Sequence, residues 1–122
     1  PEFLNRLTPD GVLFVIAHEY AHVHLEHQKK LGAKAMDLAG MPTPDMAFDA
    51  IERNPATMEK LHAMIRLFEL DADEAATKWL ASLGIGACTE DVLRSIDGAD
   101  MMMPVVPSHP GFYSRKQVIC RK

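Results

Sequence analysis

The feature that most constrains this chain is an apolar run that carries two histidines one helical turn apart. Residues 12–17 read Val-Leu-Phe-Val-Ile-Ala and lead directly into H-E-Y-A-H at 18–22. Side chains four positions apart share one face of an α-helix, so the rings of His18 and His22 face one point. Glu19 is rotated from His18 by about 100° and lies beside that point. The apolar run predicts a helix through the middle of a domain, with the histidines on its buried stripe.

Two imidazoles and a carboxylate on a buried helix need partners, because unpaired buried polar groups are costly. Neutral imidazoles can occupy two corners of a zinc tetrahedron, and a carboxylate beside them can take a proton from zinc-bound water. The spacing is the H-E-x-x-H arrangement of metallopeptidases. The alternative is a chance match, with His18 and His22 as hydrogen-bonded core residues. A metal serves all three groups at once, so the sequence predicts a zinc site.

Composition sets the size and class of the protein. With 122 residues and 48% hydrophobic content, we expect one domain, 1–122, with a modest core. The net charge of -4 is mild, and no basic stripe predicts nucleic-acid binding. The longest apolar run is too short for a membrane span. The chain starts at Pro1 and not at Met, so we expect a mature product or a piece excised from a longer protein, and that full-length protein could be membrane-associated. Cys88 and Cys120 either pair or stay free.

A long helix is predicted around the two histidines. Thr8-Pro9-Asp10 gives an N-cap, a first-turn proline and a first-turn acid. The helix is expected to run to about Leu31, with Gly32 as its stop. On such a helix His24 and His27 face away from the side of His18 and His22. They are therefore predicted to lie on the surface or behind the ligands, and not to bind the metal.

The rest of the chain is predicted to be mainly α-helical, with little or no β-sheet. Turn residues and caps place one or two short helices in 33–53, a second long helix from Asn54-Pro55 to Gly84, and a short helix over 89–96 that ends at Asp97-Gly98. The remaining expectations are the tail of a strand in 1–7, an extended segment over 101–106, a turn at 108–111, and a final helix that carries Arg115.

One charged residue interrupts the apolar stripe of the second long helix. The stripe consists of Met58, Leu61, Ile65, Ala72, Ala76, Leu80 and Leu83. Glu69 lies in its middle, and Asp73 lies one turn later, close to the same face. A carboxylate on a core face rarely lacks a partner. We therefore predict that Glu69 completes a His₂Glu site with water as the fourth ligand, and that Asp73 accepts the free ring N–H of a zinc-bound histidine.

Two alternatives compete with this ligand set. In the first, Glu69 and Asp73 pair with Arg66, Lys78 or other cations on a solvated edge. His62 shares the face of Glu69 but lies two turns away, about 10 Å along the helix axis. His62 and Glu69 cannot easily bind the same ion, so His62 is interpreted as a lining or core residue.

Three sequence blocks in this order resemble the M48 family of zinc metallopeptidases. The blocks are H-E-Y-A-H at 18–22, E-L-D-A-D at 69–73, and S-H-P at 108–110 followed by Arg115. This family of gluzincins includes CAAX-prenyl proteases and HtpX-like membrane proteases. His27, five residues after His22, also falls where many members have a histidine. The resemblance extends from about Leu7 to Ile119.

The resemblance implies a role for each matching position. His18, His22 and Glu69 would bind one zinc ion, Glu19 would act as general base and acid, and Asp73 would support a ligand. His109 and Arg115 would lie in the cleft near the transition state. The implied fold is a compact, zincin-like helical core. Family members usually have a small sheet before the active-site helix, but only about eight residues precede it here, so we expect a catalytic core only.

The implied activity is zinc-dependent hydrolysis of peptide bonds in unfolded, damaged or precursor proteins. The expected partners are protein or peptide substrates, and the expected compartment is the bacterial periplasm or a membrane surface. One alternative is a non-catalytic domain that zinc stabilises and that binds or chaperones a partner. Another is a latent protease in which His109 occupies the fourth zinc position. His109 itself has three possible roles: a hydrogen-bond donor to the oxyanion at the scissile carbonyl, the zinc ligand of that latent form, or a plain turn histidine hydrogen-bonded to backbone.

Overall fold

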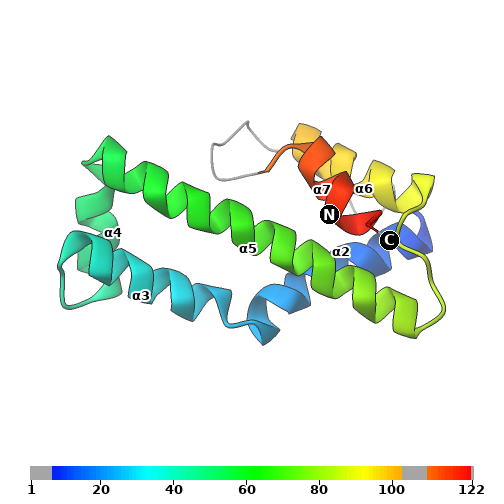
Figure 1. Cartoon of the computed structure of the whole chain (residues 1–122), viewed down its shortest axis with the longest axis horizontal. Coiled ribbons are helices and arrows are strands. Elements are labelled where there is room, and N and C mark those ends of the chain that lie inside the picture. The colour runs from blue at the N-terminus through cyan, green and yellow to red at the C-terminus, as the bar shows by residue number, and fades with distance from the viewer. Residues whose placement is uncertain (1–6, 103–109, 122) are drawn as a thin grey trace.

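The computed structural model describes residues 7–102 and 110–121, and within them it contains six helices and no strand (Figure 1). The helices are α2 (Pro9–His24), α3 (His27–Ala39), α4 (Pro44–Glu52), α5 (Pro55–Ser82), α6 (Glu90–Met102) and α7 (Phe112–Ile119). The mainly α-helical fold predicted from the sequence is therefore confirmed. The strand tail predicted at the N-terminus lies almost entirely outside the described residues.

Helix α5 runs the whole length of the molecule (Figure 1). Its predicted start is confirmed, because the Asn54 side chain accepts hydrogen bonds from the backbone N–H groups of Ala56 and Thr57. Its predicted end is also confirmed, since Gly84 follows the helix with a φ of +78°. Helices α3 and α4 pack against one half of α5, and α2, α6 and α7 gather at the other half. This one helix therefore connects both halves of the protein.

Each half has its own apolar core. The first core consists of Phe14, Ala76, Leu80, Ala87, Val92, Ile96 and Ile119. The second consists of Ala35, Ala47, Ile51 and Leu61. Along α5, Leu61 belongs to the second core and Ala76 to the first, so Glu69 lies on the stretch of helix between the two. The polar residues of that stretch lie where the two cores meet.

The prediction of one helix from Thr8 to about Leu31 is wrong. Helix α2 ends at His24, and Glu26 takes a left-handed backbone conformation with a φ of 55° before α3 begins at His27. Gly32 does not stop a helix but lies within α3. There a Cβ atom would lie 3.6 Å from Cγ of Pro44, which is an ordinary contact distance, so a side-chain methyl would fit at this position.

Two further expectations on helix ends are wrong. Helix α6 continues through Gly98 to Met102, because a single glycine costs a helix interior only about 1 kcal/mol and does not end it by itself. The extended segment expected over 101–106 is thus helical at its first two positions, and 103–106 lie outside the described residues. Leu83, expected on the apolar stripe, is 66% exposed because it is the C-cap of α5.

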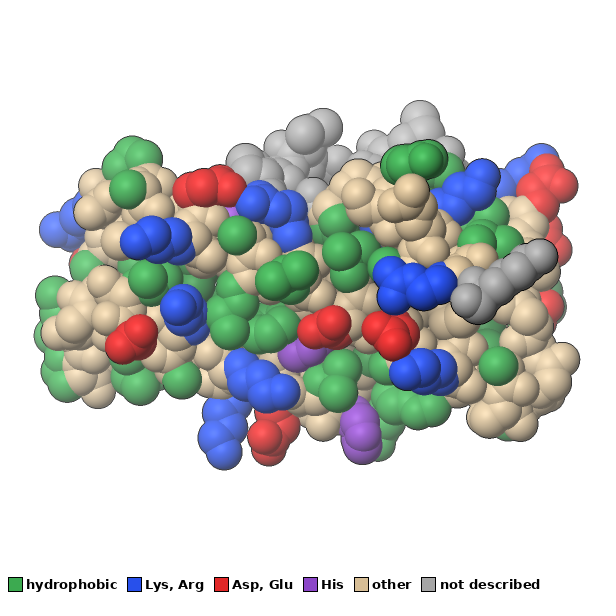
Figure 2. All heavy atoms as spheres, viewed as in Figure 1, with side chains coloured by type: hydrophobic (Ala, Val, Ile, Leu, Met, Phe, Trp, Pro, Cys, Tyr) green, Lys and Arg blue, Asp and Glu red, His purple; other side chains and the backbone are tan. Residues whose placement is uncertain are grey.

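The surface carries charges of both signs. On the face shown in Figure 2, lysines and arginines are scattered among aspartates and glutamates and do not form one basic stripe. Among the described residues, no helix combines the length and the hydrophobicity that a membrane crossing needs.

The two cysteines form a disulfide between Cys88, just before α6, and Cys120, just after α7. The sequence alone left this pairing open. The bond closes a loop across 32 positions and fixes the end of α7 beside the start of α6. The disulfide therefore also restrains α7, the helix that carries the buried side chain of Arg115.

Removing this disulfide is expected to lower the free energy of unfolding by about 3–4 kcal/mol, the loop-closure value for a loop of this length. The measurement is urea unfolding of the oxidised protein, of the reduced protein, and of the double variant Cys88→Ser, Cys120→Ser. Reductant should destabilise the wild type and leave the double variant unchanged. Equal stability of the oxidised and reduced wild type would contradict the prediction.

Candidate metal centre

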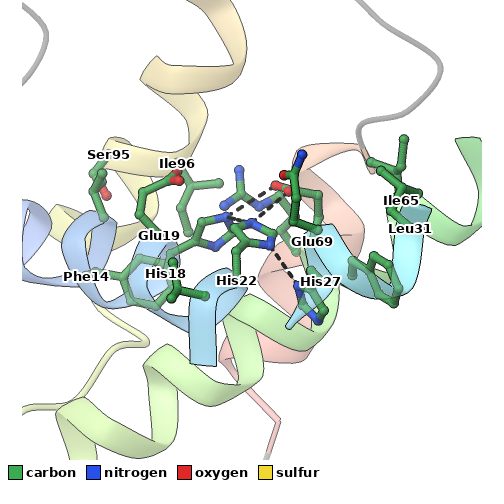
Figure 3. A pocket seen from close by; sticks show the side chains of 15 residues that line it. Phe14, His18, Glu19, His22, His27, Leu31, Ile65, Glu69, Ser95 and Ile96 are labelled. Atoms are coloured by element: carbon green, nitrogen blue, oxygen red, sulfur yellow. Dashed lines mark hydrogen bonds and ion pairs between the residues drawn. The ribbon is translucent and has the colours of Figure 1, made fainter. Parts of the chain in front are cut away.

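Helices α2 and α5 bring three side chains to one point at the middle of the molecule (Figure 3). Nε2 of His18 lies 3.1 Å from Nε2 of His22 and 3.2 Å from Oε2 of Glu69. Nε2 of His22 lies 2.9 Å from Oε1 of Glu69. The predicted meeting of two helices at His18, His22 and Glu69 is therefore observed, and this group could hold a metal ion.

The spacing of the three groups fits a small divalent cation. Ligand atoms at about 2.0–2.1 Å from a tetrahedral metal lie about 3.3–3.4 Å apart, so the triangle needs to open by only a few tenths of an ångström. Two imidazole nitrogens and a carboxylate are a common donor set for such ions. Both histidines project from one face of α2 because they are four residues apart.

A buried ion pair supports His18 from behind. Nδ1 of His18 lies 2.8 Å from Oδ1 of Asp73, which is completely buried. Arg115 on α7 donates to the same carboxylate through two nitrogens, over 2.8 Å to Oδ2 and 2.9 Å to Oδ1. This chain of contacts fixes the ring of His18 with Nε2 toward Glu69, as predicted for Asp73. It also connects three helices, α2, α5 and α7.

The charges at the centre shift two pKa values strongly. Burial opposes the charged form of His18, but the hydrogen bonds and charges of Asp73 and Glu69 outweigh it and raise the pKa of His18 to about 9. Burial likewise opposes ionisation of Glu69. The hydrogen bonds and charges of His18 and His22 outweigh that effect and hold the pKa of Glu69 well below its usual range. Opposite charges thus hold these side chains together.

The three groups face a cleft of about 450 Å³. Glu19 is exposed and lines this cleft beside the two histidines (Figure 3). Apolar side chains form most of the remaining wall: Phe14, Val15, Val23, Leu31, Ile65, Phe68 and Ile96. The centre is therefore open to a bound molecule on one side. The carboxylate of Glu19 lies on that side, and among the described contacts it pairs with neither His18 nor His22.

His27 lies at the centre, and the prediction that it faces away from His22 is wrong. Its Nδ1 is 2.8 Å from Nδ1 of His22, and its side chain is buried. The expected continuous helix would have pointed it elsewhere, but the left-handed turn at Glu26 redirects it. Burial, followed by the charge of His22, lowers the pKa of His27. His24 is exposed, as expected.

One competing interpretation placed Glu69 and Asp73 on a solvated edge, but Asp73 is completely buried and pairs with buried Arg115. Arg66 pairs with Glu59, and Lys78 pairs with Glu74, on the surface of the protein. His62 is half-buried and is not part of the group that could hold a metal ion.

Arg115 and His109 were both expected near the reacting bond, and the structure describes only Arg115. Arg115 is buried, lines the cleft and binds Asp73. Its contact with Asp73 had no signal in the sequence beyond the family motif, because 42 positions separate the two residues. His109 lies outside the described residues, so its three possible roles stay predictions.

Replacing Glu69 by alanine is expected to weaken metal binding by more than the roughly 10–100-fold that loss of an outer partner costs, because a direct ligand is removed. Titration with Zn²⁺ against a competing chelator measures this. Glu74→Ala on the same helix is the matched control, since Glu74 pairs only with surface Lys78 among the contacts described and should leave affinity unchanged. Equal affinity in Glu69→Ala would remove Glu69 from the ligand set.

Metal binding at about pH 7.5 is expected to release about one proton from His18, whose metal-free pKa is about 9. Nε2 must lose its hydrogen to bind a metal, so affinity should fall about tenfold per pH unit below this pKa and level off above it. Calorimetry of Zn²⁺ binding in buffers of different ionisation enthalpy counts the released protons. The absence of any released proton near neutral pH would contradict the prediction.

No family model matches this chain, and no curated protein or solved structure was found to be similar to it. The resemblance of its three sequence blocks to the M48 peptidases therefore stays a prediction. The arrangement of His18, His22, Glu69 and Glu19 is supported by the geometry of this chain alone.

Proposed function

We propose that this chain is the catalytic core of a zinc-dependent endopeptidase of the M48 type. The observation that carries the proposal is the triangle formed by His18, His22 and Glu69 beside the exposed carboxylate of Glu19, all facing one cleft. A purely structural zinc site usually has four protein ligands and no use for a free carboxylate next to it. The donor set here leaves a fourth position toward the cleft.

Zinc bound to His18, His22 and Glu69 would polarise a scissile carbonyl and lower the pKa of a bound water. Glu19 accepts the proton of the attacking water and passes it to the leaving amine, and its exposed position at the cleft allows both transfers. Asp73 holds the ring of His18 through Nδ1, and Arg115 balances the charge of Asp73. In this mechanism Glu19 transfers the proton, Asp73 orients a ligand, and Arg115 balances the charge of Asp73.

The proposed substrates are extended segments of unfolded, damaged or precursor proteins. The apolar walls of the cleft favour chains that expose hydrophobic side chains, because such side chains are buried in folded proteins. The disulfide between Cys88 and Cys120 supports an oxidising compartment such as the bacterial periplasm, since cytosolic thiols are kept reduced.

Glu19→Gln is expected to reduce hydrolysis of a denatured, fluorescently labelled protein by at least about 100-fold, because the amide cannot accept the proton. Zinc content and thermal stability should not change, since Glu19 is exposed. Glu74→Gln, an acid-to-amide change outside the cleft, serves as the control and should keep full activity.

Three outcomes separate the candidate functions. Loss of hydrolysis in Glu19→Gln with zinc retained supports the peptidase. Zinc binding without chelator-sensitive hydrolysis in the wild type supports the non-catalytic, partner-binding module. Hydrolysis that appears only in His109→Ala supports a latent enzyme whose zinc is covered by its own histidine.

A further inference from the structure

We propose that His27 is a positioning residue of this centre: it accepts a hydrogen bond from Nδ1 of His22 and so fixes the ring with Nε2 toward the metal. The proposal rests on the proposed metal site and extends it, because the ligand set so far leaves His22 without a supporting partner. His18 has such a partner in Asp73. His27 would complete the pair.

The direction of the hydrogen bond in a metal-loaded centre follows from which nitrogen of His22 faces the metal position. Its Nε2 lies 2.9 Å from Oε1 of Glu69 and 3.1 Å from Nε2 of His18, so Nε2 is the atom that faces the metal position. A metal-binding nitrogen needs its lone pair, which leaves the ring hydrogen on Nδ1. Nδ1 of His27 is 2.8 Å away, so with a metal bound at Nε2 of His22 it would accept this hydrogen.

The ring of His27 is itself held in place. Its side chain is buried and stacks on Phe68 of α5, with ring centroids 4.2 Å apart and planes 8° from parallel. Figure 3 shows the ring of His27 next to that of His22, with a dashed line between them. A fixed acceptor restricts rotation of the His22 ring, which is what a positioning role requires.

The backbone break before α3 makes this contact possible. On an unbroken helix His27 would lie five positions after His22, about 140° around the axis, and would point away. Glu26 instead adopts a left-handed conformation with a φ of 55°. This conformation costs an ordinary residue roughly 1–2 kcal/mol, so the fold retains a costly turn at the point that redirects His27.

Three substitutions separate this role from simple packing. His27→Phe keeps a flat ring on Phe68 but removes the acceptor. His27→Asn places an amide oxygen two bonds from Cβ, where Nδ1 of the histidine lies. His24→Phe makes the same change as the first variant at the exposed histidine of the preceding turn, and serves as the matched control.

The readouts are the Zn²⁺ dissociation constant, measured by chelator competition, and the visible spectrum of the Co²⁺-loaded protein. His27→Phe should raise the dissociation constant about 10–100-fold and alter the Co²⁺ spectrum, while His27→Asn should stay within about fivefold of the wild type and His24→Phe within about twofold. These readouts do not depend on peptidase activity.

An unchanged affinity in His27→Phe overturns the proposal, and equal losses in His27→Phe and His27→Asn show a packing role only. A wild type that binds no Zn²⁺ overturns the proposed function together with this inference. If His27→Phe does not fold, the wild type still decides. With ¹⁵N-labelled histidine and bound Zn²⁺, scalar coupling between the Nδ1 atoms of His22 and His27 is expected, and its absence contradicts the hydrogen bond.

Discussion

The buried carboxylate of Asp73 is the group on which the rest of the centre depends. It is completely buried, and burial of an isolated charge would be very costly. Arg115 and His18 both bind it, from α7 and α2, while Asp73 itself belongs to α5. Removing either partner would leave a buried charge poorly compensated. The three helices are therefore held in one arrangement by a single side chain, and that arrangement sets where Nε2 of His18 points.

The centre lies between the two apolar cores, and this position restricts how its side chains can move. Packed cores resist deformation, whereas polar groups between them can exchange partners without opening a cavity. Leu61 and Ala76 hold the two ends of the α5 stretch that carries Glu69 and Asp73. Two separate cores thus fix the carboxylates along one helix. His18 and His22 then approach these carboxylates from a single face of α2.

Local signals in the sequence were enough for most helices and for the group of His18, His22 and Glu69 that could hold a metal ion. Thr8-Pro9 and Asn54-Pro55 mark two helix starts by their caps, and Glu69 stands out because it is charged on an apolar stripe. The failures have a different cause. Gly98 is typical of a helix end, but α6 continues through it at a cost of only about 1 kcal/mol, and the left-handed turn at Glu26 has no local signal in the sequence. His27 was misplaced for that reason. The contact of Arg115 with Asp73 joins distant positions and depends on the whole fold.

The raised pKa of His18 means that a proton can supply part of the positive charge that a bound cation would bring to this group. With His18 charged, the positive charges of His18 and Arg115 balance the negative charges of Glu69 and Asp73. When a divalent cation takes the position and His18 becomes neutral, the charge of this group of four changes by only one. The hydrogen-bonded arrangement of these four side chains is therefore close in charge to one that would hold such an ion.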